Sequence, residues 1–458
     1  MGVVIEDASG IRGEAERVVA PSSPEEAAAL LREADETRTP VTVSGAGTGV
    51  VGGRCPSGGG WSFSLERFQR LEIEPGLARV GAGVLLRDVM AAAQKTGQFY
   101  APDPTEWSST IGGNIATNAS GSRSFRYGAT RRHLRALTVA LMDGTVRTYR
   151  RGERLDFPYM PLPAPKTTKN TAGYFLPPDV EWVDLFCGSD GTLGVVLEAE
   201  LALLPQPKAI LSGVVFFPSD ELTFAAVEAW RPIAQLRMLE YLDAPSLEFL
   251  RARYNDIPRN AQAALLVEQE LDGLAGDPVD EWLERLDETG ALGEASWFGE
   301  TASDRERFRL FRHTLPELVN DHVRRNGCEK LSSDFAVPLE RNGEMMAFYK
   351  ETLQRDFPGK HTIFGHIGDA HVHVNVLSES VRDFEAGKDW MLLAARQSVA
   401  LGGTVSAEHG LGKRKVHFLP LMYSAEQIDG MRKVKQHCDP HWLLGRDTML
   451  VGYSSLGV

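Results

Sequence analysis

Histidine and acidic side chains gather in two short segments of the 458-residue sequence. The first is FGHIGDAHVHVNV (residues 364–376), and the second, about 30 residues later, is SAEHGLGK (residues 406–413). Two imidazoles and one carboxylate are a ligand set that an intermediate divalent metal takes from a protein, while positions stay open for water or substrate oxygens. We predict a metal site formed by His366, His373 and Glu408; the spacing does not choose between His373 and His371.

An expected β-hairpin would position these imidazoles. Read as a strand, residues 370–376 place two histidines and Asn375 on one face and three valines on the other. The Gly368-Asp369 pair is typical of a turn, which would bring His366 back toward that polar face. The alternative is a set of ordinary hydrogen-bonded histidines on a half-buried sheet. Four histidines and a glutamate in two glycine-flanked segments favour a site.

Composition predicts an ordinary globular protein of two or three domains, because 458 residues with 43% hydrophobic side chains can bury a sizeable core. The 49 basic and 62 acidic residues give a net charge of −13, which argues against a general affinity for nucleic acid. No run reaches the roughly 20 apolar residues of a membrane span, and the N-terminus lacks a signal-peptide pattern. We expect a cytoplasmic protein, with peripheral membrane contact left open.

The cysteines are scattered without a CxxC pair, so neither disulfides nor an iron–sulfur cluster is expected at Cys55, Cys187, Cys328 and Cys438.

Three glycine-rich segments in the first 200 residues predict a ligand that contacts several loops. An expected helix begins at Ser23-Pro24, a short strand follows at residues 41–43, and the loop SGAGTGVVGG comes next. Its glycines can expose successive N–H groups as a concave anion site that suits pyrophosphate. TIGGNIATNASG (residues 110–121) and GSDGTLGVV (residues 188–196) repeat this style. Flexible surface loops are the alternative for any one segment. None forms GxGxxG between a strand and a helix, which disfavours a Rossmann domain.

Seven motifs, in order, resemble those of the FAD-linked 2-hydroxyacid dehydrogenases. They are SGAGTGVVGG, IGGNIATNASG, YGATRRHLRALTVALMDGTV, KNTAGY, LFCGSDGTLGVVLEAELALLP, FGHIGDAHVHVNV and GGTVSAEHGLGK. From about residue 15 to about residue 450 the chain is similar to the glycolate oxidase flavoprotein subunit and to D-lactate and D-2-hydroxyglutarate dehydrogenases. These enzymes belong to the vanillyl-alcohol oxidase and p-cresol methylhydroxylase superfamily.

The resemblance implies an α+β fold with three parts. Residues 1–206 would form a p-cresol methylhydroxylase-type FAD-binding domain of two subdomains, and residues 207–422 an antiparallel-sheet substrate (cap) domain that carries the metal site. Residues 423–458 would return to the FAD domain. Non-covalent FAD is expected, because residues 44–53 contain no histidine to which flavin could be attached.

The resemblance also implies roles for single residues. His409 matches the catalytic base, and Asn375 a polar residue at the substrate. Arg312 is our candidate for the substrate carboxylate, since the planar guanidinium pairs bidentately with carboxylates; a surface arginine is the alternative, and Lys330 is a weaker candidate. The expected FAD contacts are Gly45, Ala46, Gly47, Thr48, Gly49, Ser109, Thr110, Gly113, Asn114, Ala116, Gly188 and Val195.

The expected reaction is oxidation of a D-2-hydroxyacid, such as D-lactate, glycolate or D-2-hydroxyglutarate, to the 2-oxoacid. A divalent metal (Zn, Mn or Fe) would lower the pKa of the substrate hydroxyl, His409 would take its proton, and FAD would accept the hydride. A separate acceptor would then take the electrons: a quinone, an electron-transfer flavoprotein, a cytochrome or an iron–sulfur protein. Whether the protein is a homodimer stays open.

Two other functions compete with this expectation. One is a catalytically silent FAD-binding subunit of an enzyme complex, and the other is a metal-independent flavin oxidase of phenols or sugars. The sequence also departs from its relatives. Ala370 and His371 stand where many relatives have Gly and Asn, and Gly445-Arg446 stands where an Asn-Pro pair is usual.

Overall fold

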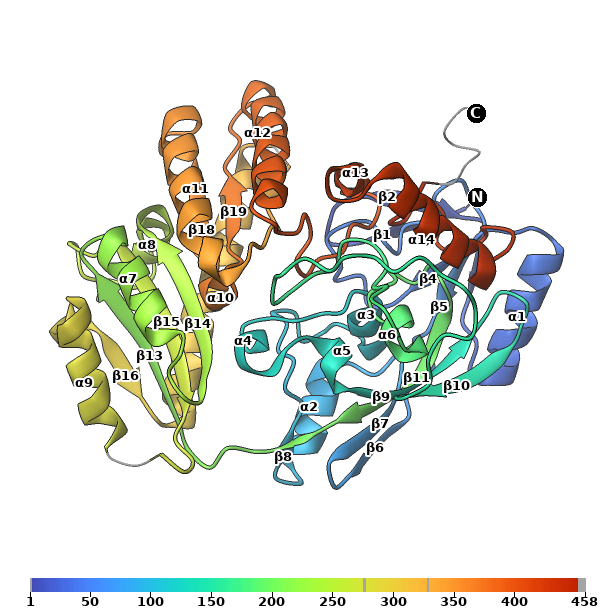
Figure 1. Cartoon of the computed structure of the whole chain (residues 1–458), viewed down its shortest axis with the longest axis horizontal. Helices are drawn as coiled ribbons and strands as arrows, with labels where there is room; N and C mark the ends of the chain where they lie inside the picture. Colours follow the sequence, from blue (N-terminus) through green and yellow to red (C-terminus); the bar gives the residue numbers. More distant parts are fainter. Residues whose placement is uncertain (1, 275–276, 328, 452–458) are drawn as a thin grey trace.

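The chain folds into two lobes (Figure 1), and this computed structural model describes residues 2–274, 277–327 and 329–451. The first lobe contains a small parallel sheet and one long helix. The Ser23 side chain accepts a hydrogen bond from the Glu26 N–H at 3.2 Å and so caps α1 (Pro24–Glu36). The expected helix start at Ser23-Pro24 is therefore confirmed. The three parallel strands lie in the order β3 (Arg17–Val19), β5 (Trp61–Ser64) and β4 (Val41–Ser44).

An antiparallel sheet forms the second layer of this lobe. Its order is β10 (Val146–Arg150), β9 (Leu134–Ala140), β11 (Val195–Ala202), β7 (Leu77–Gly81) and β6 (Leu71–Glu74). Shorter elements surround both sheets: β1 (Val3–Glu6), β2 (Arg12–Ala15), α2 (Leu86–Gln94), β8 (Gln98–Phe99), α3 (Ile111–Ala116), α4 (Ser124–Tyr127), α5 (Thr130–His133), α6 (Trp182–Phe186) and β12 (Leu204–Pro205).

The second lobe is built on an antiparallel sheet of seven strands. They lie in the order β16 (Trp297–Gly299), β13 (Ile210–Phe217), β15 (Ala263–Glu270), β14 (Leu236–Asp243), β18 (His361–Gly365), β19 (His373–Val376) and β17 (Leu331–Ser332). Alternating side chains of β13 enter two different apolar clusters, so both faces of the sheet are covered. The covering helices are α7 (Asp220–Trp230), α8 (Ala244–Arg251), α9 (Pro278–Thr289), α10 (Ala302–Arg325), α11 (Asn342–Asp356) and α12 (Val381–Ala400).

The last described segment of the chain, up to residue 451, packs against the first lobe. Here α14 (Ala425–Cys438) follows the short α13 (Leu419–Met422) and lies over the first lobe on the right of Figure 1. Beyond α14, the Val41 N–H donates to the Leu443 carbonyl and the Gly445 N–H donates to the Val41 carbonyl, each at 2.8 Å. This parallel pairing extends the sheet at β4. The Gly445 backbone is left-handed, with φ of 61°, a conformation that glycine adopts without steric cost.

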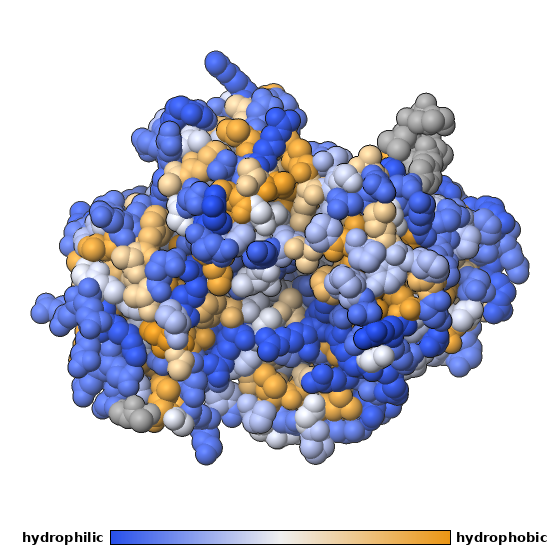
Figure 2. Space-filling view, viewed as in Figure 1, coloured by the Kyte–Doolittle hydropathy of each residue, from blue (hydrophilic) through white to orange (hydrophobic). Residues whose placement is uncertain are grey.

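Hydrophilic residues cover most of the face drawn in Figure 2, and the surface is hollowed where the two lobes meet. Across the described ranges, no helix is both long and apolar enough to span a membrane. Cys55, Cys187 and Cys438 are buried free thiols, and the fourth cysteine, Cys328, lies outside the described residues. The last seven residues of the expected C-terminal segment 423–458 also lie outside them.

Candidate functional site

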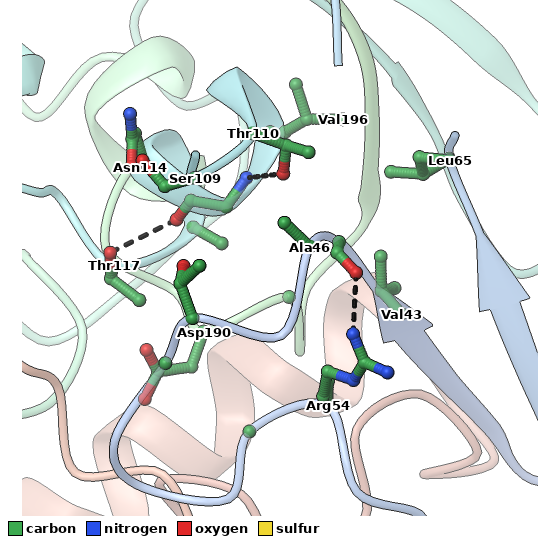
Figure 3. A pocket seen from close by; sticks show the side chains of 18 of the residues that line it. Val43, Ala46, Arg54, Leu65, Ser109, Thr110, Asn114, Thr117, Asp190 and Val196 are labelled. Atoms are coloured by element: carbon green, nitrogen blue, oxygen red, sulfur yellow. Dashed lines mark hydrogen bonds between the residues drawn. The ribbon is translucent and has the colours of Figure 1, made fainter. Parts of the chain in front are cut away.

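The glycine-rich loops of the first lobe enclose a cavity of about 160 Å³ (Figure 3). The loop after β4, the start of α3 and the turn before β11 meet there. Ten of the predicted FAD contacts line the cavity: Gly45, Ala46, Gly47, Thr48, Gly49, Ser109, Thr110, Gly113, Asn114 and Ala116. Gly188 and Val195 do not line it, but their neighbours do: Ser189, Asp190, Gly191, Gly194 and Val196.

Close packing explains the small residues of this cavity. A Cβ atom at Gly45 would lie 2.6 Å from the Thr110 hydroxyl, and the left-handed Gly47 (φ 81°) lies directly against the Arg54 guanidinium. The Thr110 side chain in turn accepts a hydrogen bond from the Gly113 N–H at 3.3 Å and caps α3. The glycine backbones therefore pack directly against side chains of the neighbouring segments, where a larger residue would not fit. Backbone N–H groups of such a loop can bind an anionic ligand.

Three charged side chains, Asp7, Arg54 and Asp190, also line this cavity, and the sequence analysis did not single out any of them. Arg54 donates from Nη1 to the Gly45 carbonyl at 2.9 Å, while its buried Nε has no hydrogen-bond partner among the described residues. Asp7 accepts a hydrogen bond from the Gly52 N–H at 2.9 Å. Burial raises the pKa of Asp190 to about 7. The sequence did offer a signal for one of the three, because Arg54 directly follows the glycine-rich loop of residues 44–53.

A second cavity, of about 180 Å³, lies where the lobes meet. Its wall comes from β14, β15, α10, β17, β18, β19 and the segment around Glu408, with Thr105 from the first lobe. All six predicted residues of the chemistry line it: Arg312, His366, His373, Asn375, Glu408 and His409. Lys330 also lines this cavity.

The predicted hairpin is present, but its turn is longer than expected. Strand β18 pairs with β19 so that Phe364 lies opposite His373 and Thr362 lies opposite Asn375. Residues 370–372 are not part of the strand, because a 3-10 turn (η3, Ile367–Asp369) and a left-handed Ala370 precede it. The regular strand is therefore shorter than expected and begins at residue 373. His371 nevertheless lies beside His373, with ring centroids 4.7 Å apart, and Val372 enters the same apolar cluster as Val374 and Val376.

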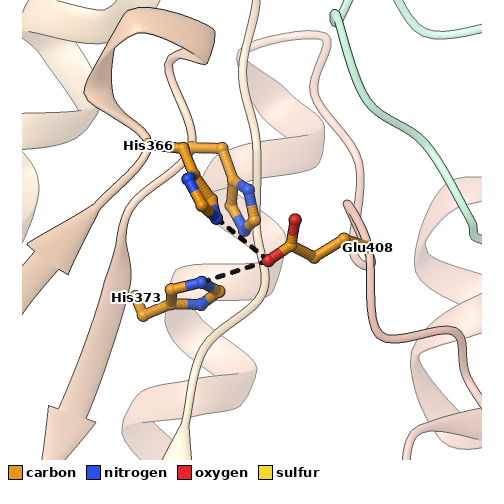
Figure 4. Close-up of side chains that lie close together, drawn as sticks. His366, His373 and Glu408 are labelled. Atoms are coloured by element: carbon orange, nitrogen blue, oxygen red, sulfur yellow. Dashed lines mark hydrogen bonds and ion pairs between the residues drawn. The ribbon is translucent and has the colours of Figure 1, made fainter. Parts of the chain in front are cut away.

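His366, His373 and Glu408 converge on one point (Figure 4). Glu408 Oε1 lies 3.1 Å from His366 Nε2 and 3.4 Å from His373 Nε2. Ligand atoms of these three residues and of His371 all lie within 4.8 Å of one another. Two imidazoles and a carboxylate at this spacing fit a divalent cation. His371 is fully buried and does not line the cavity, so its position is less open to substrate than those of the other three.

The first lobe holds the other oxygen of Glu408. Its Oε2 accepts hydrogen bonds from the Ser120 hydroxyl at 2.5 Å and from Lys169 at 3.2 Å. Burial would raise the pKa of Glu408, but Lys169 and His366 outweigh it and hold that pKa well below the ordinary range. Glu408 is therefore an ionised carboxylate whose position depends on both lobes.

Glu240 connects His366 to Arg312. The Glu240 carboxylate lies 2.5 Å from His366 Nδ1 and accepts a hydrogen bond from Arg312 Nε at 2.8 Å. Burial lowers the pKa of His366, but Glu240 reverses the effect and leaves that pKa above its usual value. Part of the Arg312 guanidinium is thus engaged with the protein. Sequence reasoning missed Glu240, whose sole signal was a carboxylate inside the apolar run of β14.

Asp334 is the buried carboxylate beside His371 and His409, as Glu240 is beside His366. It accepts hydrogen bonds from the backbone N–H groups of Glu408 (3.1 Å) and His409 (3.0 Å) and from Lys415 (3.2 Å). Its Oδ1 also lies 3.3 Å from His371 Nε2 and 3.6 Å from His409 Nδ1. Burial raises the pKa of Asp334, yet His409 and Lys415 keep it well below the ordinary range. Sequence reasoning did not single out Asp334.

Two further residues of the cavity are held in place by neighbours. His373 Nδ1 lies 3.1 Å from the Ser333 carbonyl, which can accept a hydrogen bond from it; in that tautomer Nε2 carries the lone pair that a metal ligand needs. Asn375 donates to the Thr362 hydroxyl at 3.3 Å, and its buried Oδ1 has no hydrogen-bond partner among the described residues.

Burial lowers the pKa of His409 to about 3, so its imidazole is neutral near pH 7.

The fold and both cavities define an FAD-linked oxidoreductase. Residues 15–150 match the family model described as FAD binding domain, and residues 206–448 match FAD linked oxidases, C-terminal domain. Because the second match covers more than half of the chain, this protein belongs to the FAD-linked oxidase family. The predicted family, α+β fold class and FAD cofactor are confirmed.

Several curated proteins are similar along most of their length. The D-2-hydroxyglutarate dehydrogenase of Xanthomonas citri pv. viticola is 32% identical over 439 residues, which cover 93% of this chain and 87% of that protein. The glycolate oxidase subunit GlcD of Bacillus subtilis is 30% identical, with coverage of 94% and 88%. A D-lactate dehydrogenase of Anaerostipes hadrus is 29% identical, with coverage of 96% and 90%. The chain is thus an oxidoreductase of the 2-hydroxyacid dehydrogenase family.

A solved structure shares the fold. The alkyldihydroxyacetonephosphate synthase structure superposes with a TM-score of 0.66 at 15% identity, covering 94% of this chain and 77% of that one. At this identity the similarity concerns the fold alone. The two-lobed architecture is therefore common to proteins whose sequences have diverged widely.

Proposed function

We propose that this protein oxidises a D-2-hydroxyacid to the 2-oxoacid, with a divalent metal held by His366, His373 and Glu408. The observation that carries the proposal is the single cavity in which these three residues face His409 and Asn375. A metal bound there would act as a Lewis acid and lower the pKa of the substrate hydroxyl. Zn, Mn and Fe all accept imidazole and carboxylate ligands.

His409 is the proposed base for the hydroxyl proton. A base must be unprotonated before the reaction, and burial gives His409 a low pKa. Asp334 lies 3.6 Å from its Nδ1, so this carboxylate would orient the ring and stabilise the charge it gains. The carbinol hydroxyl would give its proton to His409, and FAD, when bound, would supply the hydride acceptor.

The first lobe would hold FAD through Gly45–Gly49 and the start of α3. Arg54 adds a cation to a cavity that otherwise carries the carboxylates of Asp7 and Asp190, which makes it our candidate for pairing with the pyrophosphate. The lining residues include neither histidine nor cysteine, in keeping with non-covalent FAD. A separate acceptor would reoxidise the flavin.

Anaerobic flavin reduction tests the proposal. D- and L-2-hydroxyacids would be mixed with the FAD-loaded protein, with and without a metal chelator, while the flavin absorbance is followed. We expect fast reduction by D-acids that the chelator suppresses. Reduction that survives complete metal removal would point to a metal-independent oxidase, and no reduction by any acid would favour a silent FAD-binding subunit.

A further inference from the structure

Lys330 differs from the other cations around the substrate cavity. Arg312 is paired with Glu240 at 2.8 Å, and Lys169 is paired with Glu408 at 3.2 Å. Lys330 has no ion pair or hydrogen bond to any side chain in the described part of the protein, although it lines the cavity next to Ser332. The neighbouring acid, Glu329, is taken by Arg414 at 2.7 Å. One cation of the cavity therefore lacks a counter-ion.

The Lys330 side chain is partly buried. Burial lowers the pKa of Lys330 to about 8, which leaves the ammonium mainly charged near pH 7. A charge that is removed from water without a partner is destabilising, and an anionic ligand would compensate for it. A carboxylate that enters the cavity is the natural partner.

Space is available for a substrate that reaches Lys330. Lys330, Ser332 and His409 line not only the 180 Å³ cavity but also an adjoining cleft of about 830 Å³. The wall of the 180 Å³ cavity that Lys330 shares with the histidines is partly apolar, with Leu242, Leu266, Pro316 and Phe364. Such a wall suits the methylene groups of a longer acid, whereas glycolate has none to place there.

We propose that Lys330 binds a second carboxylate of the substrate, so that this protein prefers 2-hydroxydicarboxylic acids over chain-matched acids with a neutral end. This inference rests on the proposed function: the metal ligands would receive the hydroxyl and the first carboxylate, and the methylenes would cross the apolar wall. Lys330 is then a residue that determines specificity. A two- or three-carbon acid with a single carboxylate would leave the charge of Lys330 unpaired.

Binding of product acids to the FAD- and metal-loaded protein tests the proposal without turnover. The probes are 2-oxoglutarate and 2-oxopentanoate, which have the same chain length, and the flavin spectrum reports binding. We expect 2-oxoglutarate to bind roughly tenfold to a hundredfold more tightly, as a charge-assisted hydrogen bond allows. Lys330→Met should remove this preference, and Lys330→Arg should keep most of it. This advantage should also decrease as salt is added.

Lys388→Met provides the matched control. Lys388 lines the adjoining cleft but not the substrate cavity, and it is paired with Glu385 at 2.7 Å. This variant should keep the full preference. The comparison of the two acids on the unaltered protein needs no variant, so it stands even if a Lys330 variant folds poorly.

The outcomes separate this inference from the proposed function. If D-2-hydroxyacids reduce the flavin but the two product acids bind equally well, the role of Lys330 is overturned and the proposed function stands. A preference that Lys330→Met leaves intact overturns that role too. If no 2-hydroxyacid reduces the flavin, both ideas fail together.

Discussion

The glycine-lined cavity of the first lobe and the histidine-lined cavity between the lobes are built in different ways. Glycines and small residues from three loops form most of the first, and backbone groups face the space. Charged and polar side chains form much of the second: two glutamates, three histidines, an arginine and a lysine. A backbone cradle tolerates many side chains nearby, but a cluster of charges works only if every partner is present. Single substitutions should therefore affect the two cavities very differently.

The largest effect is expected at Glu408. Glu408→Gln keeps the shape of the side chain but removes the charge that faces both His366 and His373. We expect metal content to fall and flavin reduction by a D-2-hydroxyacid to slow on the order of 10³-fold or more. Elemental analysis and stopped-flow absorbance would measure the two effects. Full metal occupancy in this variant would refute the ligand assignment, while FAD content serves as the control.

His409→Asn should come next and should leave both cofactors in place. Loss of a positioned base typically costs about 10²–10⁴-fold in rate. We therefore expect slow flavin reduction with normal FAD and metal contents, because neither depends on this imidazole. Unchanged reduction would remove His409 from the role of base. The substitution separates proton transfer from metal binding within the same cavity.

Glu240→Gln tests support for a ligand rather than the ligand itself. Glu240 lies 2.5 Å from His366 Nδ1, and partners of this kind typically contribute about 10–100-fold to metal affinity. We expect weaker metal binding that added metal restores, with catalysis recovering at saturation. Titration of the metal-free variant would measure this. If excess metal leaves catalysis impaired, Glu240 acts on more than metal affinity.

Arg54→Ala should affect the opposite cavity. Charge-assisted hydrogen bonds contribute about 1.5–3 kcal/mol, so we expect FAD affinity to fall roughly tenfold to a hundredfold while metal content stays normal. Fluorescence titration of the FAD-free protein would measure the affinity. Arg67→Ala, on an exposed side chain outside both cavities, is the control. Equal affinities of the Arg54 variant and the unaltered protein would exclude a pyrophosphate contact.

The smallest effect should be a pH dependence at Asp190. Its pKa is raised by burial from 3.8 to about 7, so the folded protein retains a proton that the unfolded chain has lost between these pH values. Stability should therefore decrease as pH rises through this window, by up to about 1.4 kcal/mol per pH unit from this group. Melting temperatures of the FAD-free protein at pH 5 and pH 7 would show it. In Asp190→Asn the decrease should be smaller; an identical decrease would argue against this titration.

Local patterns predicted much of the molecule. The capped start of α1, the glycine loop after β4 and the β18–β19 hairpin follow from short-range signals that the structure reproduces. The hairpin also shows the limit. A left-handed Ala370 and a 3-10 turn moved the start of β19 to residue 373, because contacts with the rest of the lobe decide how a turn closes. The assignment of the metal ligands, the base and the domain boundaries stays a prediction.

The sequence by itself indicated the family, the glycine-rich loops of the first cavity and the histidine-rich segments of the second, since each depends on neighbours along the chain. Only the tertiary structure decided which charges meet. Glu240 and Asp334 lie in strands and loops far along the chain from the histidines they approach, and Lys169 of the first lobe fixes the glutamate of the second. Buried charges need partners to offset the loss of hydration, and those partners are brought together by folding rather than by spacing in the sequence.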